Sequence, residues 1–247
     1  SITQARNQPL ADLLGELVGQ PVEMRLYESH GELLDALARG EIDFTMLGPL
    51  PLLLAMENDP SLVQLAMFRE PSGQAAYRCV VAAPVDGIQS LSELKSAEDR
   101  ISLALTREQS TCGPVASYSI LIDHGLKPDA FVSGYQGGHD DVAKAVLLQS
   151  HQLGGLKESV AEQWSGLGLR ILASSIEVPG MVLLTRADSL PPGQADSLRT
   201  ALLQLEPSRL DQLQTGQFGF SDIDQTLQLR VRAMRREAEP FIERRAP

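Results

Sequence analysis

The stretch ISLALTREQSTCGPVA occupies residues 101–116 and joins an apolar strand to the start of a helix. Residues 101–105 form the predicted strand, and Pro114 suits the first turn of a helix, where its missing N–H costs nothing. The free N–H groups of Val115 and Ala116 then lie at a positive helix end, which attracts anions and favours a thiolate. Cys112 stands in the loop before this end, so we expect its sulfur to contact a ligand.

The composition is that of a folded globular protein without a nucleic-acid partner. The 247 residues are 43% hydrophobic and 21% charged, which suits one large or two modest domains. A net charge of −11 argues against a nucleic-acid partner, because such proteins normally present a basic stripe. The longest apolar run, at residues 50–56, is interrupted by Pro51 and is too short to span a bilayer.

Helical and extended patterns alternate along the chain. Apolar spacing and Gly or Pro punctuation predict helices at 10–18, 32–38, 53–57, 114–123, from 140 onward, and at 194–205, 208–213 and 223–239. Strands are predicted at 22–26, 42–47, 62–68, 77–83, 101–105, 130–133, 170–173 and 181–185. The alternation predicts an α/β fold with a largely parallel sheet.

Two stretches look like crossings between lobes. One is the extended run at 77–83, and the other lies near 174–180, which gives a first lobe of residues 1–84 plus 176–247 and a second lobe of residues 85–175. Ligands of open α/β sheets bind beyond the carboxyl ends of strands. Gly48-Pro49 and the Cys112 loop both follow such ends, one in each lobe, so we expect a ligand held between the lobes.

Several different short motifs follow one another along nearly the whole chain in an order known from other proteins. They are Ala38-Arg39-Gly40-Glu41-Ile42-Asp43, Leu47-Gly48-Pro49, residues 87–95, Ser110-Thr111-Cys112-Gly113, Ser133-Gly134, Gly137-Gly138-His139-Asp140 and residues 216–220. In this the chain resembles the phosphate/phosphonate-type periplasmic solute-binding proteins of ABC transporters, beginning after that family's first strand. The resemblance implies a two-lobed, type II (Venus-flytrap) periplasmic binding protein with two interlobe crossings, a periplasmic location, no catalysis and no cofactor.

The resemblance also implies a ligand site. In that family a Ser-Thr-Ser-Gly helix start and a histidine hold a phosphorus oxyanion, which here correspond to Ser110, Thr111, Cys112, Gly113 and His139. Glycines before the histidine, including Gly138, let the backbone approach a ligand. Tyr77 is either an aromatic wall of the site or hinge packing. Lys157 occupies a place where the family often carries an acidic residue, which argues against an aminophosphonate ligand.

Cys112 replaces the family's serine and changes the expected ligand. A hydroxyl that binds a charged oxyanion contributes about 1.5 to 3 kcal/mol, whereas a thiol is a weak donor. A thiolate instead binds thiophilic elements, so the sequence resembles the arsenite-binding members of the family, with arsenic bound to Cys112 and a membrane sensor kinase as partner. The alternative is an ABC permease partner and phosphonate, phosphite or another oxyanion as ligand. The arsenite hypothesis requires a Cys112 sulfur that is neither enclosed nor bridged to Cys79.

The remaining candidates have mostly structural interpretations. Cys79 is expected to pack within a strand, with a Cys79-Cys112 disulfide as the less favoured alternative. His30 follows a strand end and is equally compatible with ligand contact or none, whereas structural or surface roles are expected for His124, His151, Trp164 and the basic run Arg230, Arg232, Arg235, Arg236, Arg244 and Arg245.

An enzyme remains the alternative of another class. A cysteine-dependent hydrolase or transferase would use Cys112 as nucleophile and His139 as base, with the helix end as the oxyanion site. No third orienting group and no cofactor motif accompany this pair, and the cysteines and histidines lack metal-ligand spacing.

Overall fold

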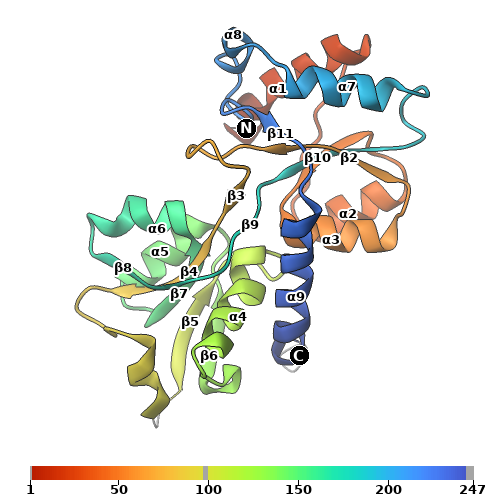
Figure 1. Cartoon of the computed structure of the whole chain (residues 1–247). Helices are drawn as coiled ribbons and strands as arrows, with labels where there is room; N and C mark the ends of the chain where they lie inside the picture. The colour runs from red at the N-terminus through yellow and green to blue at the C-terminus, as the bar shows by residue number, and fades with distance from the viewer. Residues whose placement is uncertain (1, 97–99, 243–247) are drawn as a thin grey trace. The chain divides into compact units, whose positions relative to one another are not determined.

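The computed structural model describes residues 2–96 and 100–242 and divides into two compact units (Figure 1). Unit 1 consists of Ser1–Ala76 and Pro179–Gln225, and unit 2 consists of Tyr77–Val178 and Thr226–Pro247. The chain passes between the units along two short strands, β3 (Ala76–Tyr77) and β9 (Val178–Pro179), which pair with each other. This division places residues 77–84 and the C-terminal helix in unit 2, whereas the sequence assigned both to the first lobe.

Unit 1 is built on a four-stranded antiparallel sheet. Its strand order is β1 (Phe44–Leu47), β10 (Val182–Arg186), β2 (Leu62–Phe68) and β11 (Phe220–Ser221). The accompanying helices are α1 (Ile2–Val18), α2 (His30–Ala38), α3 (Pro49–Asn58), α7 (Gln194–Leu203) and α8 (Pro207–Leu210). Apolar residues of α1 and α7 pack on β2 and β10 to form one core.

Unit 2 contains a five-stranded mixed sheet. The strand order is β6 (Phe131–Tyr135), β5 (Ile101–Leu105), β7 (Leu153–Lys157), β4 (Cys79–Pro84) and β8 (Leu169–Ser174). The β5 strand runs parallel to β6 and β7, whereas β4 runs antiparallel to β7 and β8. The larger helices of this unit are α4 (Ala116–Asp123), α5 (His139–Leu147), α6 (Glu158–Ser165) and α9 (Gln225–Ile242), and η1 (Leu91–Ser96) and η3 (Pro128–Ala130) are short 3₁₀ turns.

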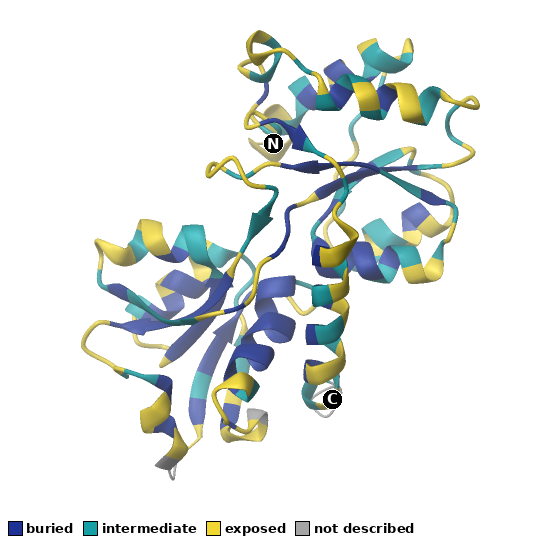
Figure 2. Cartoon of the chain, viewed as in Figure 1, coloured by how far each residue is buried: buried dark blue, intermediate teal, exposed yellow. Residues whose placement is uncertain are grey.

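Both faces of the unit 2 sheet are buried (Figure 2). Successive residues of β4 pack into two different apolar cores, one on each face of the sheet, because the side chains of a strand point to opposite faces in turn. Val81 packs with α4 and α9 residues, including Tyr118 and Ala238, whereas Val80 packs with α5 and α6 residues such as Val142. Burial on both sides explains why this strand reads as a continuous apolar run rather than an alternating one.

Most local predictions are confirmed, but some are wrong. The strands predicted at 62–68 and 101–105 coincide with β2 and β5. No strand forms at 22–26, where the described chain has no sheet partner and most side chains stay partly exposed. The prediction of a largely parallel sheet holds in unit 2 apart from β4, which runs opposite to the other four strands. It is wrong in unit 1, where every pairing is antiparallel.

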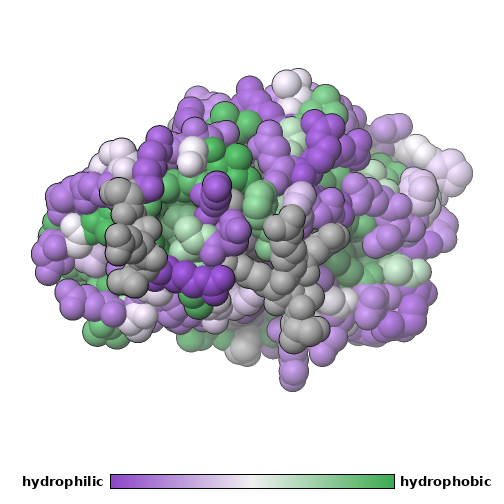
Figure 3. All heavy atoms as spheres, turned by 90° about the horizontal axis from the view of Figure 1, so that it is seen from below, coloured by the Kyte–Doolittle hydropathy of each residue, from purple (hydrophilic) through white to green (hydrophobic). Residues whose placement is uncertain are grey.

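The surface is mainly hydrophilic on the face shown in Figure 3, where apolar areas lie between charged and polar residues. Among the described helices, none is both long and apolar enough to cross a membrane. Of the basic run, Arg232 and Arg236 of α9 are exposed as predicted. Arg230 and Arg235 are partly buried and pair with Glu177 and Glu239. Arg244 and Arg245 lie outside the described residues.

Candidate functional site

Three strand-to-helix junctions meet at one edge of the unit 2 sheet. The parallel strands β6, β5 and β7 end at Tyr135, Leu105 and Lys157, and we call this side the carboxyl edge. A helical segment begins soon after each strand: α5 after β6, the turn at Thr111–Val115 after β5, and α6 directly after β7. Helix N-termini carry unpaired N–H groups and a partial positive charge, so this edge suits an anion.

The Cys112 loop is a tight turn that is buried in unit 2. The sequence predicted an α-helix opening at Pro114, but residues Thr111–Val115 form a π-helical turn and α4 begins at Ala116. A side chain at Gly113 would lie 2.7 Å from the carbonyl oxygen of Arg107 and 2.9 Å from Oγ1 of Thr106. Only glycine fits there, so the backbone can fold back against the end of β5.

Cys112 forms a disulfide with Cys79, which corrects two expectations. The Cα atoms of the two residues are 5.1 Å apart, and their side chains are 1% and 0% exposed. Cys79 does pack in β4 as predicted, but its sulfur is bonded to Cys112 rather than merely buried. The expected free thiolate facing a ligand is therefore absent, because the sulfur of Cys112 is both bridged and enclosed. This bond ties the Cys112 loop to the strand beside β7.

His139 is the first residue of α5 and lies against the end of β7. Its Nδ1 accepts a hydrogen bond of 3.1 Å from the backbone N–H of Lys157. The pKa of His139 is lowered from 6.5 to about 4, first by burial and then by the charge of Lys157, with Asp140 acting in the opposite direction. The imidazole is therefore neutral near pH 7. Because Nδ1 is the acceptor, the proton resides on Nε2, which makes that atom a hydrogen-bond donor.

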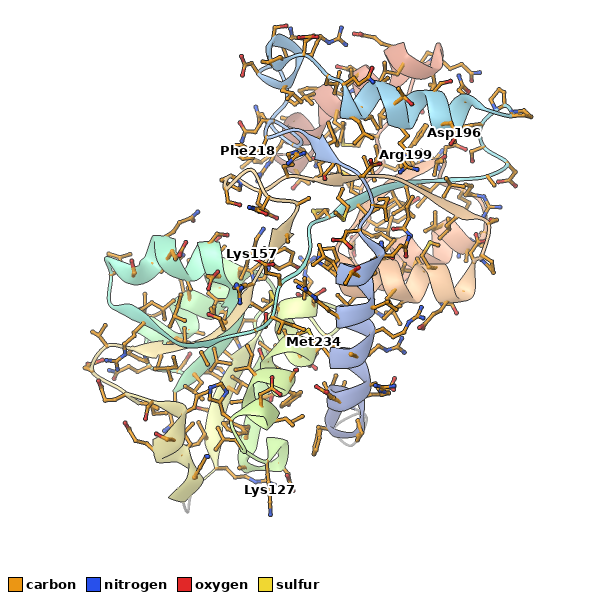
Figure 4. All side chains as sticks on the ribbon, in the orientation of Figure 1. Lys127, Lys157, Asp196, Arg199, Phe218 and Met234 are labelled. Atoms are coloured by element: carbon orange, nitrogen blue, oxygen red, sulfur yellow. A yellow bond between two sulfur atoms is a disulfide. The ribbon has the colours of Figure 1, made fainter. Side chains whose placement is uncertain are left out.

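Lys157 is the residue of this site that the sequence reasoning did not include. Its Nζ lies 4.5 Å from the centroid of the Tyr77 ring, a cation–π contact. Figure 4 shows Lys157 at the end of β7, beside the ribbon of β3 and β4. Lys157 is also the antiparallel partner of Cys79, so its contacts join Tyr77, His139 and the disulfide into one group. The sequence did give one signal for Lys157, namely a lysine where the family often carries an acidic residue. That signal was taken only as an argument against an aminophosphonate ligand, not as evidence that Lys157 contacts Tyr77 and His139.

The acidic residues at the carboxyl edge are held by neighbouring groups. Asp140 accepts a 2.8 Å hydrogen bond from Nε1 of Trp164, and Asp141 caps α5 by accepting from the N–H of Gly138 at 3.1 Å. Glu158 of α6 accepts a 3.0 Å bond from Oγ of Ser174. The edge therefore combines these three carboxylates with Lys157 and the helix N-termini.

The other predicted residues fall elsewhere or have structural roles. His30 starts α2 in unit 1, and Nδ1 of His124, at the end of α4, lies 2.8 Å from the carbonyl oxygen of Ile120. Trp164 packs beside the α5–α6 core as expected. In the described part of the chain no group of three or more Cys, His, Asp or Glu residues could hold a metal ion. A cysteine nucleophile is not available either, because Cys112 is bonded to Cys79.

Solved structures with this architecture are two-lobed periplasmic binding proteins. XAC2383 from Xanthomonas citri, solved with chloride, shares 21% identity over 99% of this chain and 96% of its own, with a TM-score of 0.78. PhnD1 from Prochlorococcus marinus, solved with methylphosphonate, shares 16% identity over 96% and 93% of the chains, with a TM-score of 0.78. SsuA from Escherichia coli, an aliphatic sulphonate-binding protein, shares 14% identity over 98% and 84%, with a TM-score of 0.58. These likenesses establish the fold.

The family is established by sequence. Residues 1–227 match the family of phosphonate periplasmic substrate-binding proteins of ABC transporters, and the chain belongs to that family. Membership implies a periplasmic location, a small anionic ligand and cooperation with an ABC permease. Homologues of this kind bind substrates and are not enzymes.

Proposed function

We propose that this protein binds a small tetrahedral oxyanion, such as a phosphonate, phosphite or sulfonate, at the carboxyl edge of unit 2 and delivers it to an ABC permease. The contact of Lys157 with both Tyr77 and His139 carries the proposal. It gathers a cation, a neutral imidazole donor and an aromatic wall on the side where three helical segments begin.

Each part has a distinct role in holding the ligand. Nε2 of His139 donates a hydrogen bond to a ligand oxygen, and the helix-start turn at Thr111–Val115 contributes its positive end. The N–H groups of Ser110 and Gly113 already donate to the carbonyl oxygens of Arg107 and Ser110. Gly138 keeps the start of α5 open to close approach. The methylphosphonate complex of PhnD1, which shares this fold, supports the same class of ligand.

Calorimetry with methylphosphonate, phosphite, phosphate, sulfate and methanesulfonate tests the proposal. We expect at least one of these anions to bind, and His139→Ala to weaken that binding by about tenfold or more, the value of a hydrogen bond to a charged group. His124→Ala is the matched control, because His124 ends α4 and takes no part in the site. The proposal fails if none of the five anions binds, or if the two variants bind equally well.

Because the sulfur of Cys112 is bridged and enclosed, arsenite is excluded as a ligand of the oxidised protein. It is a second candidate only for protein in which reduction breaks the disulfide and opens the Cys112 loop. Two electrons and two protons from a phosphine or dithiol reductant would convert the Cys79–Cys112 disulfide into two thiols. Arsenous acid would then form two As–S bonds and release two water molecules. The observation in its favour is that two sulfurs, rather than the single one expected, lie together beside the helix-start turn. A sensor kinase would be the partner in this case.

Arsenite titration of oxidised protein and of protein reduced and then freed of reductant separates this candidate from the first. Binding only after reduction, with loss in both Cys79→Ser and Cys112→Ser, supports it. Equal arsenite affinity in the oxidised protein or in Cys112→Ser counts against it.

A further inference from the structure

The loop after β5 contains two buried polar atoms that have no hydrogen-bond partner. Within residues 2–96 and 100–242 three side-chain atoms are of this kind, and two of them are Oγ1 of Thr106 and Oε1 of Gln109. Such atoms are rare, because a polar group that leaves water without gaining a new partner costs free energy. Two of them in one short loop indicate that this loop meets a group from outside the chain.

Thr106 is the stronger candidate of the two. It is 2% exposed, and its hydroxyl is its only polar side-chain group, so among the described residues all of its side-chain hydrogen-bonding capacity is unused. Gln109 is half-buried and also has an amide nitrogen. The third atom, Nε of Arg170, belongs to a guanidinium whose other nitrogens already donate two hydrogen bonds. Thr106 is therefore the least satisfied of the three side chains.

Thr106 lies between the starts of two helical segments. Its Oγ1 is 2.9 Å from the position that a Cβ atom of Gly113 would occupy, so the hydroxyl points at the helix-start turn. Its carbonyl oxygen lies 3.5 Å from the backbone nitrogen of Gly137, just before α5. Because β5 is the middle one of the three parallel strands, Thr106 occupies the centre of the carboxyl edge.

An unpaired hydroxyl at this place suits an anion. The group of Gly113 that faces Oγ1 is a C–H, which is a weak donor and cannot accept the hydroxyl proton. An unprotonated oxygen of an oxyanion is an acceptor, and a hydrogen bond to a charged oxygen is stronger than one between neutral groups. The positive ends of the neighbouring helical segments favour the same charge.

We propose that Thr106 is a ligand-binding residue whose hydroxyl donates a hydrogen bond to an unprotonated oxygen of the bound oxyanion. The inference rests on the proposed function, since it assumes that an oxyanion binds at the carboxyl edge. The loop that continues from Thr106 is exposed at Arg107 and Glu108 and half-buried at Gln109 and Ser110. A shift of this loop lets a ligand oxygen reach the enclosed hydroxyl, and the new bond offsets the cost of burying the hydroxyl unpaired.

Two substitutions isolate the hydroxyl. Thr106→Val keeps the branched shape of the side chain and removes the hydroxyl, whereas Thr106→Ser keeps the hydroxyl. The probe for calorimetry is methylphosphonate, or the tightest binder among the five anions of the first experiment if methylphosphonate does not bind. Thr106→Val is expected to weaken binding by about tenfold to a hundredfold, and Thr106→Ser to stay within about threefold of the unmodified protein.

Melting temperatures separate a ligand contact from a structural role. Because the hydroxyl has no partner among the described residues, Thr106→Val without ligand should melt at the same temperature as the unmodified protein or higher. A drop of more than about 3 °C is the effect of losing one ordinary hydrogen bond in a chain of this size, and it would show that the hydroxyl is bonded within the fold. Thr106→Ala replaces the valine variant in the affinity measurement if the latter does not fold.

Thr185 provides a control with the same change of side chain. It is 1% exposed in β10 of unit 1, and its Oγ1 lies 3.4 Å from the carbonyl oxygen of Arg186. Thr185→Val therefore also removes a buried hydroxyl, but away from the carboxyl edge, and should leave the affinity for the anion unchanged.

The outcomes separate the two proposals. If none of the five anions binds the unmodified protein, both proposals fail. If an anion binds and His139→Ala weakens it, but Thr106→Val binds as tightly as the unmodified protein, only the role of Thr106 fails. Weaker binding in Thr106→Val that is absent from Thr106→Ser and Thr185→Val supports both. A crystal structure of the complex gives the direct measurement, with Oγ1 of Thr106 expected within about 3.2 Å of a ligand oxygen; a separation too long for a hydrogen bond overturns the role of Thr106.

Discussion

The backbone N–H of Lys157 donates to Nδ1 of His139 across 3.1 Å and joins the end of β7 to the start of α5. Because the donor is a backbone group, the tautomer of His139 does not depend on which side chain occupies position 157. The imidazole ring is therefore prepared as a donor through Nε2 before any ligand arrives. Preorganisation of this kind reduces the entropy lost on binding.

His139 should make the stability of the protein depend on pH. Its pKa is about 4 in the folded protein and near 6.5 when unfolded, so between these values the unfolded chain binds more protons. The contribution of His139 to the free energy of unfolding is therefore complete above pH 6.5 and is lost as the pH falls to 4. The loss is no more than about 3 kcal/mol. In urea unfolding from pH 7 to pH 4, His139→Gln should lose less stability than the unmodified protein. Parallel curves for the two proteins would contradict the assigned burial.

The disulfide should stabilise unit 2. Cys79 and Cys112 are separated by 33 positions. Cross-linking a loop of this length reduces the entropy of the unfolded chain, which raises the free energy of unfolding by about 3–4 kcal/mol. Reduction should therefore lower the denaturation midpoint of the unmodified protein. The midpoint of the double variant Cys79→Ala, Cys112→Ala should be the same with and without reductant. A thiol count of two in the unreduced, unfolded protein would show that the bond does not form.

Gly155 should tolerate no side chain. A Cβ atom there would overlap Oγ of Ser117, whose hydroxyl donates to the carbonyl oxygen of Cys112, and would lie 3.1 Å from Cδ2 of Leu105. Gly155→Ala is expected to cost about 1–3 kcal/mol of unfolding free energy, as overpacking does, and to weaken anion binding by shifting the Cys112 loop. Gly166→Ala is the control, since nothing lies within 4 Å and its φ of −63° suits alanine. Equal stability of the two variants would refute the close approach of α4 to β7.

Asp59 should contribute to unit 1 through a half-buried ion pair. Its carboxylate lies 2.9 Å from Nη1 of Arg186 and accepts two hydrogen bonds from Ser61, which lower its pKa together with the charge of Arg186. Asp59→Asn is expected to cost about 1 kcal/mol at pH 7 in urea unfolding. The exposed pair of Arg199 and Asp222 gives the comparison, with less than about 0.5 kcal/mol lost in Asp222→Asn. A larger loss in Asp222→Asn than in Asp59→Asn would contradict this ranking.

The sequence predicted several residues of the proposed site, but not how they meet. Gly113 and His139 were predicted because glycine, proline and helix-start residues carry strong local signals. The prediction of a free thiol at Cys112 was wrong, because its partner Cys79 lies 33 positions away in the sequence. The role of Lys157 was missed because it depends on a ring in β3 and an imidazole in α5, 80 and 18 positions away in the sequence. Nothing in the local pattern around a lysine reports such distant neighbours.

Local order along the chain was determined by the sequence itself. The apolar runs at 62–68 and 101–105 became β2 and β5 unchanged, and Gly19, Gly40 and Gly125 end helices with positive φ angles, which few other residues adopt. Tertiary structure alone decided the direction of β4 and β10, the absence of a strand at 22–26, and the bond between Cys79 and Cys112. These features depend on which distant segments become neighbours, and that choice is made by burial and pairing over the whole fold rather than by any residue's own preference.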